Sequence, residues 1–479
     1  MEKLSDLEWI RAAVERHEDE IVKLSDSIFD FAETGFQEFQ SAALFTEMLK
    51  ADGFTVESGI AGIPTAFTAG FGTGKPVIGL LAEYDALPGL SQEGGVTECR
   101  KREGNPDGHG CGHNLLGAGA YAAAVAVKEY LEKNREKGTV ILYGCPSEEK
   151  GNAKTLMARD GIFDGLDAAF TWHPADRNYV SSFSSLANVS VYFDFKGITS
   201  HAAAAPHLGR SALDAAELMN VGVNYLREHV IQEARIHYAY TDVGGIAPNV
   251  VQGSSRLHYF IRAPKTEQVL EIFERVKDIA KGAALMTGTE SSFEIYSGLS
   301  DFVPNRTLTQ VLYEAMKDIG APAFDDGDYA AAAGFFSQAF GQESLQARAA
   351  ALAGEFGRKP EEIAAHPLDT GIAELKWNMP VLPGSTDVGD VSHVVPTAQC
   401  SYATMALGTA MHTWQATAQG NTSAAHKAVL AAGEALALAV VRVMQDEEIR
   451  EKMVEDWKQE TGGIYICPIS ADVKPHLEG

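Results

Sequence analysis

The stretch PVIGLLAEYDALPG, residues 76–89, decides the fold. Its apolar run VIGLLA contains no polar residue and is short for a helix, so it predicts a strand that is buried on both faces. The run ends before Pro88 and Gly89, which favour a turn. Glu83 and Asp85 follow the run directly. The stretch therefore predicts a buried parallel strand whose carboxyl end carries acidic side chains.

Helix and strand patterns alternate on either side of this run. Amphipathic or alanine-rich segments predict helices, and short apolar segments predict further buried strands. The expected helices cover residues 41–54, 115–138 and 153–163, and the expected strands cover 139–145 and 166–173. Strands that alternate with helices indicate an α/β fold, in which a mainly parallel sheet is covered by helices.

The pattern changes near residue 188. NVSVYFDFKG, residues 188–197, alternates apolar and polar side chains, which is typical of a strand with one solvent-facing side. The order of elements from there onward is βαββαβ, the ferredoxin-like pattern. We therefore expect a domain over 188–300 that is inserted into a discontinuous domain over 1–187 and 301–479. An alanine-rich segment over 328–356 is expected to be a helical elaboration of the discontinuous domain.

The composition excludes several classes of protein. The chain has 479 residues, of which 45% are hydrophobic and 22% are charged, and its formal net charge is −26. Nucleic acids and anionic membranes require a cationic face, so neither is expected as a partner. The N-terminal segment lacks the pattern of a signal peptide, and we expect no transmembrane helix. Five cysteines do not make a disulfide framework, which indicates a reducing, cytoplasmic location.

Residue types that bind metals follow the ends of several expected strands. They are Cys111 and His113 in GHGCGHNLLG (residues 108–117), Glu148 and Glu149 after the strand at 139–145, and His173 at the end of the strand at 166–173. Open α/β sheets bind their ligands beyond the carboxyl ends of the strands, so we expect these side chains to converge. A thiolate and an imidazole suit zinc and other divalent metals, which predicts a metal site.

Two local features sharpen this prediction. The glycines on either side of Cys111 allow a tight turn that aims Cys111 and His113 at one point. In the Glu148–Glu149 pair, one carboxylate can bind metal while the other acts as a general base. Each feature alone has a plainer interpretation, such as an inert buried thiol, a cysteine nucleophile or a solvated pair of acids. Their combination favours the metal site, to which His109 is a weaker candidate.

These motifs resemble a known family. The segments LAEYDALPG, GHGCGHN, PSEE and FKGITSHAAAAPHLGRSALDA begin at residues 81, 108, 146 and 195. They are similar to segments of the co-catalytic metallopeptidases that include aminoacylases, desuccinylases and auxin-conjugate amidohydrolases. The Cys-Gly-His form resembles the amidohydrolase branch, although Asn114 stands where auxin-conjugate hydrolases have an aspartate. The resemblance implies a zinc-exopeptidase-like catalytic domain and an inserted lid domain that also forms a dimer.

The resemblance also implies two divalent metal ions per chain, manganese or zinc. The ligands that it implies are Cys111, His113, Glu149, His173 and His412. His393 is the alternative to His412, and Cys111 is our choice for the ligand that bridges the two ions. Glu148 is expected to be the general base, and Asp85 is expected to orient a ligand imidazole.

The lid domain is expected to complete the site. His201 matches a histidine that reaches the active site of a partner subunit and stabilises the oxyanion there. Asn249 and Arg262 match positions that hold the carboxylate of the substrate, which an arginine fork fits through two parallel hydrogen bonds. We therefore expect a homodimer through the lid domain, or a heterodimer with a related subunit.

The expected activity is hydrolysis of the amide bond of an N-acyl amino acid, a small molecule, with p-aminobenzoyl-glutamate as the first candidate. One alternative is a dipeptidase for peptides with a basic C-terminal residue. An alternative of another class is a non-catalytic, metal-binding subunit of a hetero-oligomeric hydrolase. The sequence argues against the last alternative, because every expected ligand and the base are present.

Overall fold

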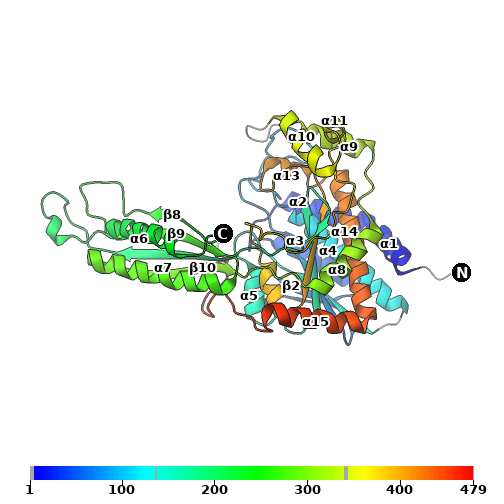
Figure 1. Cartoon of the computed structure of the whole chain (residues 1–479), viewed down its shortest axis with the longest axis horizontal. Coiled ribbons are helices and arrows are strands. Elements are labelled where there is room, and N and C mark those ends of the chain that lie inside the picture. Colours follow the sequence, from blue (N-terminus) through cyan, green and yellow to red (C-terminus); the bar gives the residue numbers. More distant parts are fainter. Residues whose placement is uncertain (1–4, 135–136, 339–343, 478–479) are drawn as a thin grey trace.

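The strand that follows Pro76 lies in the middle of a seven-stranded sheet (Figure 1). The computed structural model describes residues 5–134, 137–338 and 344–477. The strand order is β1-β2-β4-β3-β5-β11-β6. The strands are Thr55–Ser58 (β1), Phe67–Thr73 (β2), Val77–Ala82 (β3), Gly138–Gly144 (β4), Ala168–Ala175 (β5), Tyr179–Val180 (β6) and Thr397–Ala403 (β11). The neighbours β4, β3, β5 and β11 are parallel, which confirms the predicted α/β class with a mainly parallel sheet.

Helices cover both faces of this sheet. Along β3, Ile78 and Leu80 pack into the apolar core on one face, and Leu81 packs into the core on the other. The first face is covered by α1 (Asp6–Arg16), α2 (Glu18–Phe31), α4 (His113–Asn134), α8 (Arg306–Ile319) and α14 (Ser423–Gln445), and the second by α5 (Ala153–Arg159) and α12 (Val388–Val394). This part also holds α3 (Phe39–Ala51), α13 (Trp414–Gln419) and α15 (Glu447–Thr461).

Helix α14 is the apolar centre of the first layer. It approaches α4 so closely that a Cβ on Gly433 would lie 2.5 Å from the Cβ of Ala122, so only glycine fits there. Among the described helices, α14 alone is long and apolar enough to cross a membrane. However, 78% of its most apolar window is buried inside the protein, as in a core helix.

The smaller part of the molecule is an arm that projects from the larger part (Figure 1). Its elements are β7 (Ala187–Lys196), α6 (Ala212–Leu226), β8 (Arg235–Asp242), β9 (Ser254–Ala263), α7 (Thr266–Thr287) and β10 (Glu290–Leu299). They follow the order βαββαβ and form an antiparallel sheet with the order β10-β7-β9-β8. Helices α6 and α7 pack on one face of this sheet around a separate apolar core. We refer to this part as the arm.

The alanine-rich segment forms α9 (Asp326–Phe336) and α10 (Leu345–Phe356), and α11 (Pro360–Ala365) follows. As expected, these helices pack on the larger part, where they share an apolar core with Leu407 and Ala424. Residues 339–343 of this segment lie outside the described residues.

The structure differs from the expected elements at several boundaries. Strands β1 and β2 were not anticipated, because β2 contains two glycines and lacks a clear apolar alternation. The helix expected over 153–163 already ends at Arg159, close to Gly161, which has a φ of +76°. Gly138 begins β4 instead of closing the preceding helix.

Candidate metal centre

The carboxyl ends of β3, β4, β5 and β11 lie at the same edge of the sheet, and most of the expected polar residues meet there. Asp85 follows β3, Glu149 follows β4, His173 lies on β5 and His412 follows β11. Cys111 lies just before α4. Parallel strands bring residues that are far apart in the sequence to one edge, which is where open α/β sheets bind ligands.

Cys111, His113 and His173 form one group, in which the candidate ligand atoms lie within 4.8 Å of one another. The Sγ of Cys111 is 3.5 Å from Nε2 of His173. Gly112 has a φ of +74°, which favours glycine, and the turn directs the side chains on either side of it to one point. Nδ1 of His113 lies 2.8 Å from Oδ1 of Asp85, so Asp85 orients the imidazole and leaves Nε2 to face the group.

Cys111 also belongs to a second group, with Glu149 and His412. Nε2 of His412 lies 3.1 Å from Oε1 of Glu149. The N–H of Glu149 donates to Oδ2 of Asp85 at 3.0 Å, so one carboxylate supports both groups. His412 has a φ of +60°, a costly conformation for a residue with a side chain, and its N–H donates to the carbonyl of Gly110. The fold thus holds Cys111 where the two groups meet.

Glu148 lies beside these groups and belongs to neither. It forms a third group with Glu83 and His113. Burial, with the charges of Glu83 and Glu149 adding to it, raises the pKa of Glu148 well above its usual range. Burial alone would also raise the pKa of Glu149, but His412 and His113 lower it to about 2. The two adjacent carboxyls therefore differ in proton affinity.

The donor set fits divalent metal ions. Nε2 of His113 and Oε2 of Glu83 are buried and have no hydrogen-bond partner among the described residues. Buried polar atoms without a partner are costly unless a ligand satisfies them. Thiolate, imidazole and carboxylate groups together are typical ligands of zinc and related divalent metals.

The alternative histidines lie elsewhere. His109 is buried, and its Nε2 lies 3.0 Å from the backbone oxygen of Ile28; burial lowers the pKa of His109 to about 3. It is therefore a neutral histidine of the interior. Nε2 of His393 lies 3.1 Å from the backbone oxygen of Asp301. The structure therefore brings His412, and neither alternative, to the cluster.

The residues expected to complete the site from the arm are not brought together. His201 and Asn249 are exposed, and backbone pairing joins their loops next to the start of β9. Arg262 lies near the end of β9, where Nη1 donates to Oγ of Ser385 at 3.3 Å. From its first residue, Ser254, to Arg262, β9 rises roughly 3.3 Å per residue, so this part of the strand is roughly 26 Å long. Within one chain, Asn249 and Arg262 therefore cannot hold the same carboxylate.

Sequence reasoning did not single out three buried residues near the site, Lys154, Asp387 and Glu38. Lys154 is fully buried, and its Nζ lies 2.6 Å from Oε1 of Glu83 and 2.5 Å from Oδ1 of Asp387. Glu38 accepts a hydrogen bond from the N–H of Ser147 at 2.8 Å, and burial raises the pKa of Glu38 to about 8. The signal available for Lys154 was a lysine in the first turn of a helix whose residues 153–158 are otherwise uncharged.

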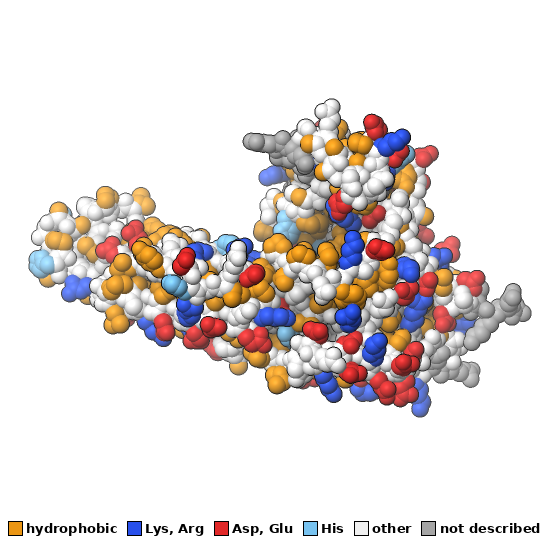
Figure 2. Space-filling model, viewed as in Figure 1, with side chains coloured by type: hydrophobic (Ala, Val, Ile, Leu, Met, Phe, Trp, Pro, Cys, Tyr) orange, Lys and Arg blue, Asp and Glu red, His pale blue; other side chains and the backbone are white. Residues whose placement is uncertain are grey.

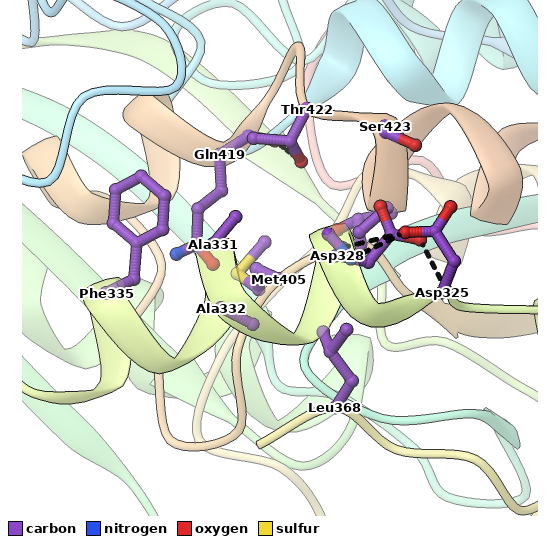
Figure 3. A pocket seen from close by; sticks show the side chains of 13 residues that line it. Asp325, Asp328, Ala331, Ala332, Phe335, Leu368, Met405, Gln419, Thr422 and Ser423 are labelled. Atoms are coloured by element: carbon purple, nitrogen blue, oxygen red, sulfur yellow. Dashed lines mark hydrogen bonds between the residues drawn. The ribbon is translucent and has the colours of Figure 1, made fainter. Parts of the chain in front are cut away.

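The cluster is separate from a cavity beneath α9. That cavity has a volume of about 140 Å³ and is lined by Asp328, Phe335, Met405 and Gln419, among others (Figure 3). None of its lining residues belongs to the groups described above.

Figure 2 shows that the arm and the larger part meet at an open angle, with hydrophobic side chains along the exposed arm.

Comparisons with known proteins relate the chain to hydrolases. Residues 79–413 match the model of peptidase family M20/M25/M40. The chain is 44% identical over 476 residues to one of the subunits of p-aminobenzoyl-glutamate hydrolase from Escherichia coli (strain K12), and the match covers 98% of each chain. It is 27% identical to the Xaa-Arg dipeptidase of Homo sapiens, in a match that covers 95% of this chain and 92% of that one. The YXEP protein of Bacillus subtilis, a dinuclear metal binding peptidase of the M20 family, has a similar fold, with a TM-score of 0.56, 16% identity and coverage of 90% and 99%.

Proposed function

Because the chain belongs to peptidase family M20/M25/M40, we propose that it is a metal-dependent amidohydrolase of N-acyl amino acids, with p-aminobenzoyl-glutamate as the first candidate substrate. The observation that carries the proposal is the position of Cys111. It belongs to two groups of metal-binding side chains, beside the carboxyl of Glu148, which belongs to neither. The Escherichia coli relative, which is similar over nearly the whole chain, is named for this substrate.

Two divalent ions, manganese or zinc, fit the two groups. Cys111, His113 and His173 would hold one ion, and Cys111, Glu149 and His412 would hold the other, so Cys111 would be shared by both groups. When bound, such ions polarise the scissile carbonyl and make water a stronger nucleophile. The thiolate and imidazoles favour zinc, whereas the carboxylate suits manganese as well.

Glu148 is the proposed general base. Its carboxyl lies next to the two groups without belonging to either, so it is free to exchange a proton with a water molecule there. It would accept a proton from the attacking water and donate it to the leaving amine. Asp85 would keep the His113 imidazole in the tautomer whose Nε2 faces the cluster, because Oδ1 of Asp85 lies at Nδ1.

Arg262 is the residue proposed to bind the carboxylate of the substrate. The chain carries 65 acidic residues and 39 basic ones, yet no described carboxylate lies within ion-pair distance of Arg262. Its Nε is buried without a hydrogen-bond partner, and burial lowers the pKa of the guanidinium. A half-buried cation without an anion is costly, and the carboxylate of an acyl amino acid would satisfy it.

His201 and Asn249 are proposed to act on the active site of a second subunit. Both are exposed on the arm, and β8 forms an open edge of its sheet. Exposed apolar residues on this arm include Tyr225, Ile246 and Leu285, whose exposed fractions are 75%, 99% and 84%. Such a surface fits an interface between subunits. We propose a homodimer through the arm, with a related second subunit as the alternative that the name of the Escherichia coli relative suggests.

The active compartment is proposed to be the cytoplasm. All five cysteines are free thiols, including Cys111 in the cluster, and a reducing compartment keeps them so.

The test is a substrate panel with the purified chain alone, loaded with manganese or with zinc. The panel contains p-aminobenzoyl-glutamate, other acyl-glutamates, and dipeptides that end in arginine or lysine. Selective release of p-aminobenzoate and glutamate is the expected result. Preference for the basic dipeptides would instead assign the dipeptidase activity for which the human relative is named. No turnover until a second type of subunit is added would contradict catalysis by this chain alone.

A further inference from the structure

A buried lysine links the edge of the metal cluster to two carboxylates. Lys154 is the second residue of α5, and it is fully buried. Its Nζ lies 2.6 Å from Oε1 of Glu83, at the end of β3, and 2.5 Å from Oδ1 of Asp387, just before α12. The backbone N–H of Lys154 also donates to Oδ2 of Asp387, at 3.0 Å. This triad joins three segments at one edge of the cluster.

The triad fixes the orientation of Glu83. An ammonium group without water requires anionic partners, and Glu83 and Asp387 supply them. Oε1 of Glu83 is occupied by the ammonium, so Oε2 must point away from it. Oε2 is buried and has no hydrogen-bond partner among the described residues. Because only 2% of Glu83 is exposed, solvent does not replace the missing partner.

The free oxygen of Glu83 faces the atom through which His113 would bind a metal. Oε2 lies 3.2 Å from Nε2 of His113, which is likewise buried and has no hydrogen-bond partner among the described residues. Nδ1 of the same imidazole is taken by Asp85 at 2.8 Å. Two atoms that bind one ion at about 2.1 Å each, with an angle between tetrahedral and octahedral, lie roughly 3.0 to 3.4 Å apart. The spacing of these two unsatisfied atoms is therefore that of two ligands of one ion.

We propose that Glu83 is a further ligand of the ion that His113 binds, and that Lys154 and Asp387 are positioning residues that present Oε2 to it. This inference rests on the proposed two-metal function and adds a ligand to it. A carboxylate that is clamped on one oxygen can bind an ion with the other without losing further side-chain freedom. It would also lower the net charge of the ion and its ligands at this position.

The test compares metal binding by the wild-type chain, Glu83→Gln and Glu83→Asp. Glutamine keeps an oxygen that accepts a hydrogen bond from Lys154, but it places an NH2 group where Oε2 was. Aspartate keeps the charge but is one methylene shorter. Asp390→Asn is the matched control, because Asp390 is a buried carboxylate of α12 that bonds to Thr155 and Ser300 away from the cluster. All chains are titrated with Co²⁺ and Zn²⁺ in metal buffers, without substrate.

The expected result is that both Glu83 variants bind one of the two ions about 10- to 100-fold more weakly, as loss of a metal-supporting group typically does. The ligand-field bands of bound Co²⁺ should change, while the thiolate-to-cobalt band from Cys111 remains and Asp390→Asn matches the wild type. Two ions bound with wild-type affinity and spectrum in either folded Glu83 variant would overturn the inference. A wild-type chain that binds fewer than two ions contradicts the proposed function itself, which separates the two failures.

Discussion

The strand-end edge of the seven-stranded sheet and the outer loops of the arm hold their polar residues in different ways. At the strand ends, His113 is fully buried between Asp85 and Glu83, at 2.8 and 3.2 Å. In the arm, His201 is exposed, and its Nδ1 accepts hydrogen bonds from the N–H groups of Ala203 and Ala204 in its own loop.

This difference separates side chains that one chain holds together from side chains that it leaves apart. Buried side chains with two or more fixed contacts are ready to bind ions without rearrangement. The imidazole of His201 has no described contact with any residue of the cluster, so it can contribute to catalysis only where another surface meets the arm. The metal centre is thus expected to survive changes in the arm, whereas the proposed function makes turnover depend on both regions.

The largest expected effect is at the strand-end edge. Glu148→Gln removes the proposed base but leaves both metal groups intact, so turnover should fall by about 10²- to 10⁴-fold with little change in metal content. Glu149→Gln is the adjacent comparison, and it should lose bound metal as well as activity. Steady-state kinetics and metal analysis of the two variants check this. Full activity in Glu148→Gln would show that the base is another group.

The next largest effect is expected in the arm, at His201. His201→Ala should reduce kcat by about 10²- to 10³-fold, because a donor to the oxyanion is lost, while metal content stays unchanged. If His201 acts across subunits, a mixture of refolded His201→Ala and Glu148→Gln chains contains dimers with one complete site.

Random pairing of these two inactive variants should restore about a quarter of the wild-type activity, since half of the dimers are mixed and each has one complete site. Activity measured before and after co-refolding checks this, and each variant refolded alone is the control. A mixture that stays as inactive as its parts would mean that His201 serves its own chain or none.

A smaller effect concerns the end of the arm that lies next to the larger part. Arg262→Met should raise KM for acyl-glutamates by about 10- to 100-fold, with a smaller change in kcat, because the proposed contact is to the substrate carboxylate. Arg256→Met on the same strand is the control, since Arg256 is already paired with Asp194 and Glu294. Equal changes in both variants would indicate a structural role for Arg262.

The sequence predicts the strand-end edge better than the arm, for physical reasons. Apolar runs and turn residues in the sequence predict β3, β4 and β5. The carboxyl ends of parallel strands lie at the same edge of a sheet, so the positions of Cys111 and His173 follow from these local patterns. The family match confirms the predicted class, a metal-dependent amidohydrolase. The ion pair of Lys154 with Asp387 joins residues 233 positions apart, and no local pattern reports such a contact.

The arm shows where a sequence argument reaches its limit. The family resemblance assigns Asn249 and Arg262 to the same substrate carboxylate. Because β9 extends between them, they lie at opposite ends of the arm. Similarly, the alternation that predicts the strands of the arm does not indicate which surface covers their exposed edge.

The smallest expected effect concerns a buried acid that lies outside both regions. Glu434 on α14 is largely buried, and its only described ion pair is with Arg11 at 3.7 Å. Burial raises the pKa of Glu434 to about 7, from 4.5. The folded state therefore holds this proton more tightly than the unfolded state. The resulting stabilisation is complete below about pH 4.5 and is lost as the pH rises through 7.

Glu434→Gln removes this titration, so the variant should be more stable than the wild type by about 1 to 3 kcal/mol at pH 8.5 and nearly equal to it at pH 4.5. Denaturant unfolding at both pH values measures the difference. Glu451→Gln, at an exposed acid on α15 that does not shift the pKa of Glu434, is the control and should change stability little at either pH. Activity should remain at the wild-type level, unlike that of the variants at the cluster. A variant that gains no stability at pH 8.5 would mean that Glu434 is ionised at little cost in the folded protein.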